Sequence, residues 1–422
     1  MALFSENFQW PSSSVVFESI GDGARDGTAK VVERGGRWIL KSPSSFSYAT
    51  GQPGIRVLTA SLDGTPTLIR GTVFAIDGDL GLRVDELRVG SALDDAQYTT
   101  VTATFEHLAS VSSCRHEDGA ARSPGQPLVF PASGGASQME ATLRSGENSI
   151  TLVVPEPVPL EDFETQLAVF QAMLTFAADL PCGQLTLVAT DRSGQTVNIF
   201  GRDKYAPFER PTRKPVEYTL RFAGDWIQHT IERWWVAYSE WKPVLQILAG
   251  LRYQPGYVDA DVILSSAAIE SVATELQQHE APRLSSHESR PILEALESLT
   301  GLNHAQKEAV AQLKGDLGRT TFRSKVVQLI RHVDDEVWQQ ARASIEEWTK
   351  QFLKARNTIA HAVSSDIWEN GVLLRGIRDA NWIVLTLVIL KYLDVPDPAI
   401  GRAAERLGTR HGVRYRGIEI FT

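Results

Sequence analysis

Cysteine and long apolar runs are both scarce in this sequence. Two cysteines, Cys114 and Cys182, cannot form a disulfide framework in a chain of 422 residues, which favours a reducing cytoplasm. The longest apolar run, residues 382–390, is too short to span a bilayer, which takes about 20 residues. Residues 1–14 lack a basic start followed by an apolar core, so we expect no signal peptide. The sequence therefore predicts a soluble cytoplasmic protein with no membrane contact.

Several common catalytic motifs are also missing. The chain contains no phosphate-binding P-loop, no zinc helix of the His-Glu-x-x-His type, no Cys-x-x-Cys pair and no Gly-x-Ser-x-Gly nucleophile turn. We therefore predict neither a cofactor nor a metal ion. The 42 Lys and Arg residues against 51 Asp and Glu give a net charge of −9. This balance argues against sequence-blind coating of nucleic acid, but it allows one local basic cleft.

The first half of the chain reads as β-strands. Short segments rich in β-branched residues alternate with turn signals such as Asp63-Gly64. A helix is expected over residues 160–174, where apolar residues recur with a 3.6-residue period before Pro181. Residues 191–194 are expected to form a hairpin turn. The predicted strands are 56–60, 67–76, 80–89, 98–108, 149–154, 185–190 and 196–200. This half is predicted to be an antiparallel β-rich domain, a sandwich or open barrel with one covering helix.

The spacing at which apolar residues recur changes from two residues, as in strands, to 3.6 residues, as in helices, after a proline-rich stretch at residues 203–215. We therefore predict an α+β protein of two domains, with a β-rich domain over 1–205, a linker over 206–219 and an all-helical bundle over 220–422. The predicted helices of the second half are 226–238, 259–278, 291–300, 321–332, 336–361 and 380–393.

One local group of residues points to chemistry. Asn357 and His361 are four residues apart on a predicted helix, so they share one face, and the long side chain of Arg356 can reach the same spot. Arginine binds phosphate through paired hydrogen bonds, and histidine transfers protons near neutral pH. Together they suit phosphodiester cleavage without a metal. On spacing alone, the favoured explanation of an Arg and a His at a helix end is structural, because both side chains suit the helix dipole there.

Residues 352–361, which read Phe-Leu-Lys-Ala-Arg-Asn-Thr-Ile-Ala-His, resemble the Arg-Asn-x-x-x-His signature of HEPN domains (higher eukaryotes and prokaryotes nucleotide-binding). The layout resembles ApeA-like bacterial HEPN proteins, in which an N-terminal β-rich domain precedes a HEPN helical bundle. Residues 170–187 resemble the end of that N-terminal domain. Residues 262–276 resemble the first long HEPN helix, and residues 321–330 resemble the helix before the signature.

The resemblance implies a metal-independent endoribonuclease of an antiviral-defence or toxin type, acting as a homodimer paired through its HEPN domains. Arg356 would hold the scissile phosphate, and His361 would act as general base or acid on the ribose 2′-hydroxyl and the leaving oxygen. Asn357 would orient His361 or the phosphate. Glu270 would orient Arg356 or His361, or it is an ordinary surface carboxylate. The implied partners are RNA, with transfer RNA as one candidate, and a trigger of phage or other origin bound by the N-terminal domain.

Other interpretations of the same sequence stay open. Some HEPN domains act as non-catalytic nucleotide-binding, protein-binding or dimerisation modules, and the N-terminal domain could be a sensor or a scaffold. A tryptophan cluster at residues 226–241 could stack on bases, although packing between domains explains it better. An arginine cluster near the end of the chain could contact RNA or be a solvated surface. Its members are Arg402, Arg406 and Arg410, followed by Arg414 and Arg416.

Overall fold

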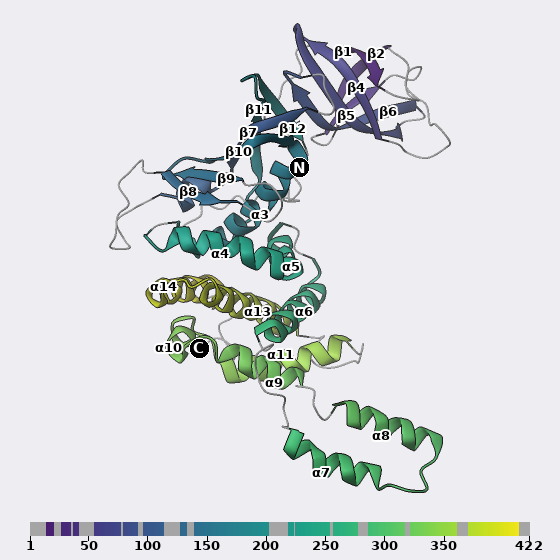
Figure 1. Cartoon of the computed structure of the whole chain (residues 1–422), viewed down its shortest axis with the longest axis vertical. Helices are drawn as coiled ribbons and strands as arrows, with labels where there is room; N and C mark the ends of the chain where they lie inside the picture. Colours follow the sequence, from purple (N-terminus) through teal and green to yellow (C-terminus); the bar gives the residue numbers. More distant parts are fainter. Residues whose placement is uncertain are drawn as a thin grey trace. The chain divides into compact units, whose positions relative to one another are not determined.

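The structure is a computed structural model of the chain, which combines an antiparallel β-region with a helical region (Figure 1). The chain divides into two compact units, Met1–Pro255 with Leu393–Pro396, and Gly256–Tyr392 with Asp397–Thr422. The predicted two-part α+β class is confirmed. The structure describes residues 14–20, 27–34, 37–41, 55–76, 79–91, 96–113, 127–132, 139–201, 218–222, 224–253, 256–276, 286–316, 321–360 and 370–412.

Six antiparallel strands at the start of the first unit close into a barrel. Their order is β3-β2-β1-β4-β5-β6, and a further pairing of β3 with β6 joins the two ends. Alternate side chains point inward, and Phe17, Leu58, Ile69 and Leu82 are almost fully buried in the resulting core. The strands are β1 (Ser14–Ile20), β2 (Gly27–Arg34), β3 (Arg37–Lys41), β4 (Ile55–Leu62), β5 (Thr65–Ile76) and β6 (Asp79–Val89).

The sheet continues beyond the barrel, because β12 pairs with β6 and the order runs on as β12-β11-β7-β10-β9-β8. Helix α3 (Leu160–Ala178) packs on β7 and β10, as the predicted covering helix should. Asp191 stabilises the predicted hairpin turn, since its Oδ1 accepts hydrogen bonds from the backbone of Ser193 and Gln195. The remaining elements here are β7 (Gln97–Phe105), α2 (Leu108–Val111), β8 (Pro127–Pro131), β9 (Glu140–Arg144), β10 (Ser149–Pro159), β11 (Gln184–Thr190) and β12 (Thr196–Gly201).

Two helices, α4 (Ile227–Glu240) and α5 (Lys242–Tyr253), belong to the first unit. The buried Trp234 donates from its indole nitrogen to the carbonyl oxygen of Val169 at 3.0 Å, and its ring lies 5.3 Å from that of Phe176. Trp235 lies on the same helix, with its ring 5.4 Å from that of Phe130. These tryptophans therefore hold α4 against the β-rich part, whereas most of the predicted linker, residues 206–217, lies outside the described residues.

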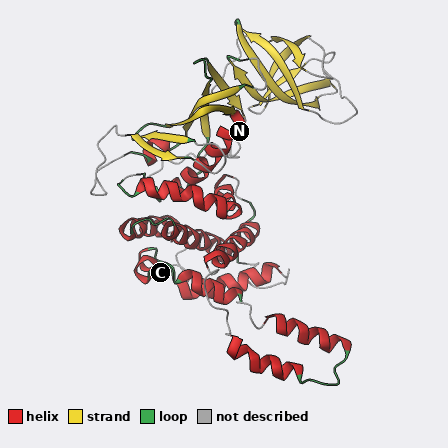
Figure 2. Cartoon of the chain, viewed as in Figure 1, coloured by secondary structure: helices red, strands yellow, loops and turns green. Residues whose placement is uncertain are grey.

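The described part of the second unit is entirely helical (Figure 2). Helix α6 packs against α13, α9 and α11, and α14 packs against α10 and α13. None of the helices in the described ranges combines the length and the apolar character that a membrane span requires. The helices are α6 (Val258–Leu276), α7 (Ser286–Glu297), α8 (His304–Asp316), α9 (Phe322–Ile330), α10 (Asp335–Gln340), α11 (Ile345–Ala360), α13 (Gly371–Tyr392) and α14 (Asp397–Leu407), followed by a π-helical turn, η3 (Gly408–Gly412).

The single helix predicted over residues 336–361 is wrong in one respect, because the chain breaks it into α10 and α11. The break contains Arg342, whose φ of 52° is in the left-handed region and cannot continue an α-helix. The apolar residues of α10 and α11, together with Thr349, continue the three- and four-residue spacing of a helix across the break. The sequence pattern therefore gives no sign of the turn. As a result, the direction of α11 is set independently of α10.

Candidate functional site

Helix α11 carries the first two residues of the predicted signature in its last turn. Trp348, Phe352 and Ala355 form its fully buried stripe, at the three- and four-residue spacing of one helix face. Arg356 follows this stripe at the edge of the core and is half-buried, and Asn357 is exposed. His361, the third predicted residue, lies outside the described residues.

Arg356 is held from two other helices. Its Nη2 lies 3.8 Å from Oε2 of Glu270 on α6, and its guanidinium carbon lies 4.9 Å from the ring centre of Phe322 at the start of α9. Its Nη1 also approaches Oδ1 of Asn357 at 3.4 Å. A cation over an aromatic face and beside a carboxylate is attracted by both. With 32% of its side chain still exposed, Arg356 is placed firmly while part of the guanidinium stays open to solvent.

Glu270 itself lies between two cations. Its Oε1 is 3.8 Å from Nζ of Lys325 on α9, and its Oε2 faces Arg356. Lys325 also donates to the hydroxyl of Thr274, one turn further along α6, at 2.9 Å. The structure thus brings together three of the predicted site residues, Arg356, Asn357 and Glu270, and adds Lys325, which the sequence analysis missed.

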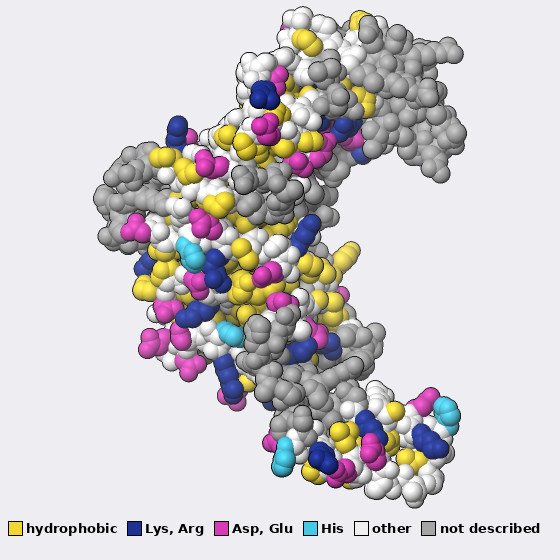
Figure 3. Space-filling model, viewed as in Figure 1, with side chains coloured by type: hydrophobic (Ala, Val, Ile, Leu, Met, Phe, Trp, Pro, Cys, Tyr) yellow, Lys and Arg dark blue, Asp and Glu magenta, His cyan; other side chains and the backbone are white. Residues whose placement is uncertain are grey.

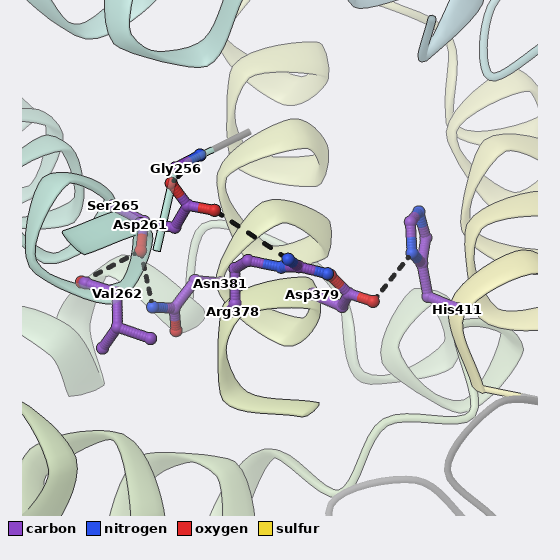
Figure 4. Close-up of polar contacts among 8 residues, drawn as sticks. All are labelled: Gly256, Asp261, Val262, Ser265, Arg378, Asp379, Asn381 and His411. Carbon is purple, nitrogen blue, oxygen red and sulfur yellow. Dashed lines mark hydrogen bonds and ion pairs between the residues drawn. The ribbon is translucent and has the colours of Figure 1, made fainter. Parts of the chain in front are cut away.

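An aromatic and amide layer supports the site from inside the helical unit. The rings of Trp348 and Phe352 stack at 5.1 Å, and Phe322 packs on Phe352 at 5.8 Å. The indole nitrogen of Trp348 donates to Oδ1 of the buried Asn381 at 2.9 Å. Asn381 in turn donates to the hydroxyl of Ser265 on α6 at 2.9 Å (Figure 4). This chain of bonds fixes α11, α13 and α6 together directly behind Arg356.

A buried charged network runs across α13, from Asp261 on α6 to His411 in η3 (Figure 4). Arg378 bridges Asp379 at 2.9 Å and Asp261 at 3.8 Å, and Nδ1 of His411 lies 3.4 Å from the second oxygen of Asp379. Asp261, Asp379 and His411 are each at least 95% buried. Because buried charges are costly unless paired, this network ties α6, α13 and η3 into one arrangement. This network was not predicted from the sequence, although the polar residues in the otherwise apolar α13 were a usable signal.

The predicted arginine cluster belongs to a different set of helices. Arg402 and Arg406 lie on α14 and Arg410 lies in η3, and all three are half-buried. The main contacts of α14 are with α10, α13 and η3, whereas those of α11 are with α6, α9 and α13. Arg414 and Arg416 lie outside the described residues.

No family model, curated protein or solved structure matches this chain. The chemistry of the site must therefore be argued from its own residues. Within the described ranges, no three His, Cys, Asp or Glu side chains are grouped so that they could share one metal ion. What the described site offers is a fixed, partly open guanidinium with a neighbouring amide, which is a donor set suited to a phosphate oxygen.

Proposed function

We propose that this protein is a metal-independent endoribonuclease of the HEPN type, working in antiviral defence or as a toxin. The observation that carries the proposal is the placement of Arg356. Its guanidinium is held at the end of α11 by Glu270 and Phe322, and five residues further along the sequence is His361. A fixed cation and a titratable imidazole at this spacing match the Arg-Asn-x-x-x-His pattern.

The reaction needs only groups that these side chains supply. His361 takes the proton from a ribose 2′-hydroxyl, and the 2′-oxygen attacks the adjacent phosphorus while the bond to the 5′-oxygen breaks. The leaving 5′-oxygen receives a proton from a protonated imidazole, which gives a 2′,3′-cyclic phosphate and a 5′-hydroxyl. Arg356 stabilises the negative charge that builds on the phosphoryl oxygens, and Asn357 orients either His361 or the phosphate.

A two-fold homodimer of the helical unit would supply both the base and the acid, one histidine from each copy. RNA is the substrate because the 2′-hydroxyl is the nucleophile, and transfer RNA is one candidate because a structured target suits a chain with a net charge of −9.

The β-rich part would bind the trigger, of phage or other origin, that releases activity. Arg402, Arg406 and Arg410 are candidate outer contacts for RNA.

The first prediction concerns the two signature residues. Wild type, Arg356→Ala and His361→Ala are incubated with total RNA and transfer RNA in EDTA. Loss of the phosphate-binding cation should lower the rate about 10²–10³-fold, and loss of the proton carrier about 10²–10⁴-fold. Arg375→Ala is the matched control, because Arg375 is an exposed arginine on α13. Circular dichroism melts establish that each variant is folded.

The competing function is a HEPN module that binds nucleotide or protein without catalysis. The observation that favours it is the engagement of Arg356 by Glu270, which also fits a purely structural arginine. Equal cleavage by wild type and both signature variants would show that these residues do not carry the chemistry. RNA binding without cleavage by any form would favour the binding module instead.

A further inference from the structure

A groove runs along the second unit between α9 and α11. It has a volume of about 530 Å³, within the range of ligand sites in proteins, which is about 300–1,000 Å³. Its apolar lining comes from Val327 and Ile330 on α9 and from Ile345 and Leu353 on α11. All four are half-buried, so their apolar surface is still in part open to a ligand.

The groove leads to the candidate site. Phe322, at the start of α9, contacts Phe352 and Arg356 near the end of α11, so the two helices run in opposite directions. Leu353 is the lining residue nearest that end of α11, and it lies one helical turn before Asn357, on the same face. A chain lying in the groove would therefore reach Arg356 and Asn357 where it emerges.

The charged side chains of the groove are mostly basic. Arg323, Arg331 and Lys350 line it, against a single acidic residue, Glu346. Lys350 is paired with Glu347 at 3.3 Å, but within the described residues neither Arg323 nor Arg331 has an ion-pair partner, and both are exposed. By contrast, Arg290 on the α7–α8 hairpin pairs with Glu294 on its own helix, and acidic and basic side chains intermingle on that hairpin (Figure 3). The groove thus presents two exposed cations, Arg323 and Arg331, to which an anionic ligand can bind.

We propose that the α9–α11 groove binds the single-stranded RNA segment that flanks the cleaved bond, with phosphates on Arg323 and Arg331 and bases against the apolar lining. Single-stranded nucleic acid joins a regularly charged backbone to flat apolar bases, which matches a groove with an apolar floor and a basic rim. The contacts read no base edges, so binding tolerates many sequences. This inference rests on the proposed RNA substrate and deepens it by naming the path of the strand.

Binding is tested with a fluorescent oligouridylate whose 2′-hydroxyls are all methylated, which cannot undergo 2′-hydroxyl attack. Anisotropy titrations compare the wild-type full-length chain with Arg323→Glu/Arg331→Glu. We expect at least about tenfold weaker binding, because two phosphate contacts become repulsive. The milder Arg323→Gln/Arg331→Gln pair should reduce the slope of log affinity against log salt by about 1.4, since each single-strand phosphate contact contributes about 0.7.

The control is Arg375→Glu, an exposed arginine on α13 outside the groove, which should bind like wild type. Equal affinity of wild type and both groove pairs would overturn the inference, and so would absence of binding by folded wild type. Competition by polyglutamate as strongly as by RNA would also overturn it, because the groove would then be a site for an acidic protein.

The two proposals fail separately. If the groove arginines determine binding of the methylated strand but total RNA and transfer RNA are not cut in EDTA, the groove stands and the nuclease falls. If RNA is cut while the groove pairs bind as wild type does, the nuclease stands and the groove falls.

Discussion

Arg356 is the residue on which the proposed activity depends, and its surroundings come from three helices. Glu270 and Phe322 fix its guanidinium, and Trp348 and Phe352 pack behind it. The sequence motif named Arg356 and Asn357 without showing what holds them. Glu270 lies 3.8 Å from Arg356, so it is placed to orient the guanidinium, and its part in catalysis stays a prediction.

The second prediction separates positioning from stability at this ion pair. Glu270→Gln keeps the shape of the side chain but removes the charge that faces Arg356. Because 41% of the Glu270 side chain is exposed, the free energy of unfolding should change by less than about 1 kcal/mol. Cleavage should nevertheless fall about ten- to hundredfold, since a misplaced phosphate ligand is costly to the transition state. Urea denaturation and the cleavage rate in EDTA measure the two effects. An unchanged rate would leave Glu270 an ordinary surface carboxylate.

The third prediction concerns the amide that links the helices behind the site. Asn381→Leu leaves the buried indole nitrogen of Trp348 and the hydroxyl of Ser265 without their present partner. Such a loss costs about 1–3 kcal/mol. Urea denaturation should show this loss, whereas Arg375→Leu, at an exposed position of the same helix, should change stability little. Equal stability of wild type and Asn381→Leu would mean that the amide does not secure α11.

At the scale of elements, periodicity located the strongly patterned segments but missed those that depend on distant partners. Strands β5, β6 and β12 and helices α3 and α6 were predicted close to their observed bounds, because their apolar residues follow one period. The closure of β3 onto β6 could not be predicted, since pairing of strands distant in sequence leaves no local signal. Helix α5, which follows α4 after a single residue, was not predicted.

The candidate site was also predictable only in the part that is local in sequence. The motif gave Arg356 and Asn357, which are adjacent in sequence. Lys325 and Phe322 could not be found in the same way, because they come from α9 and meet Arg356 only through helix packing. The network of Asp261, Asp379 and His411 likewise joins residues far apart in the chain.

The fourth prediction concerns pH and the turn that enters α2. His107 adopts a left-handed backbone with a φ of 64°, and burial lowers the pKa of its imidazole, partly offset by Glu106. The unfolded chain, with the ordinary pKa near 6.5, therefore binds a proton more readily than the folded chain. The contribution of His107 to the free energy of unfolding is therefore fully present above pH 6.5. It is lost as the pH falls from 6.5 toward the lowered pKa of the folded chain.

His107→Asn tests this element, because asparagine tolerates the left-handed conformation and does not titrate in this range. Urea denaturation at pH 7.5 and pH 5.0 should give a smaller loss of stability for the variant than for wild type. The same loss for both proteins would show that His107 is not the group responsible.

At the scale of the whole molecule, the compact unit that contains the β-rich part extends to Pro255. Tyr253 on α5 bonds to Thr175 and to the backbone of Cys182, and Arg252 lies 2.6 Å from the buried Asp179. Helices α4 and α5 therefore complete the first unit. The domain boundary was predicted near residue 215, where the spacing of the apolar residues changes from that of strands to that of helices. Composition and spacing do not show which unit a helix packs against.

The fifth prediction follows from that packing. A fragment of residues 1–205 lacks α4 and α5 and should expose the apolar surface that Trp234 and Trp235 cover. A fragment of residues 1–255 keeps this surface covered. The shorter fragment should bind the dye ANS strongly and unfold at lower urea, whereas the longer one should bind little dye. Identical dye binding and unfolding would contradict the assignment of both helices to the first unit.

The proposed activity of the whole molecule is cleavage of RNA through the 2′-hydroxyl without a metal ion. It is tested by mass spectrometry of the product ends after the protein has acted on transfer RNA in EDTA. We expect 2′,3′-cyclic phosphate and 5′-hydroxyl ends with wild type, and intact RNA with His361→Ala. Products with 3′-hydroxyl and 5′-phosphate ends, or cleavage that stops in EDTA, would contradict it.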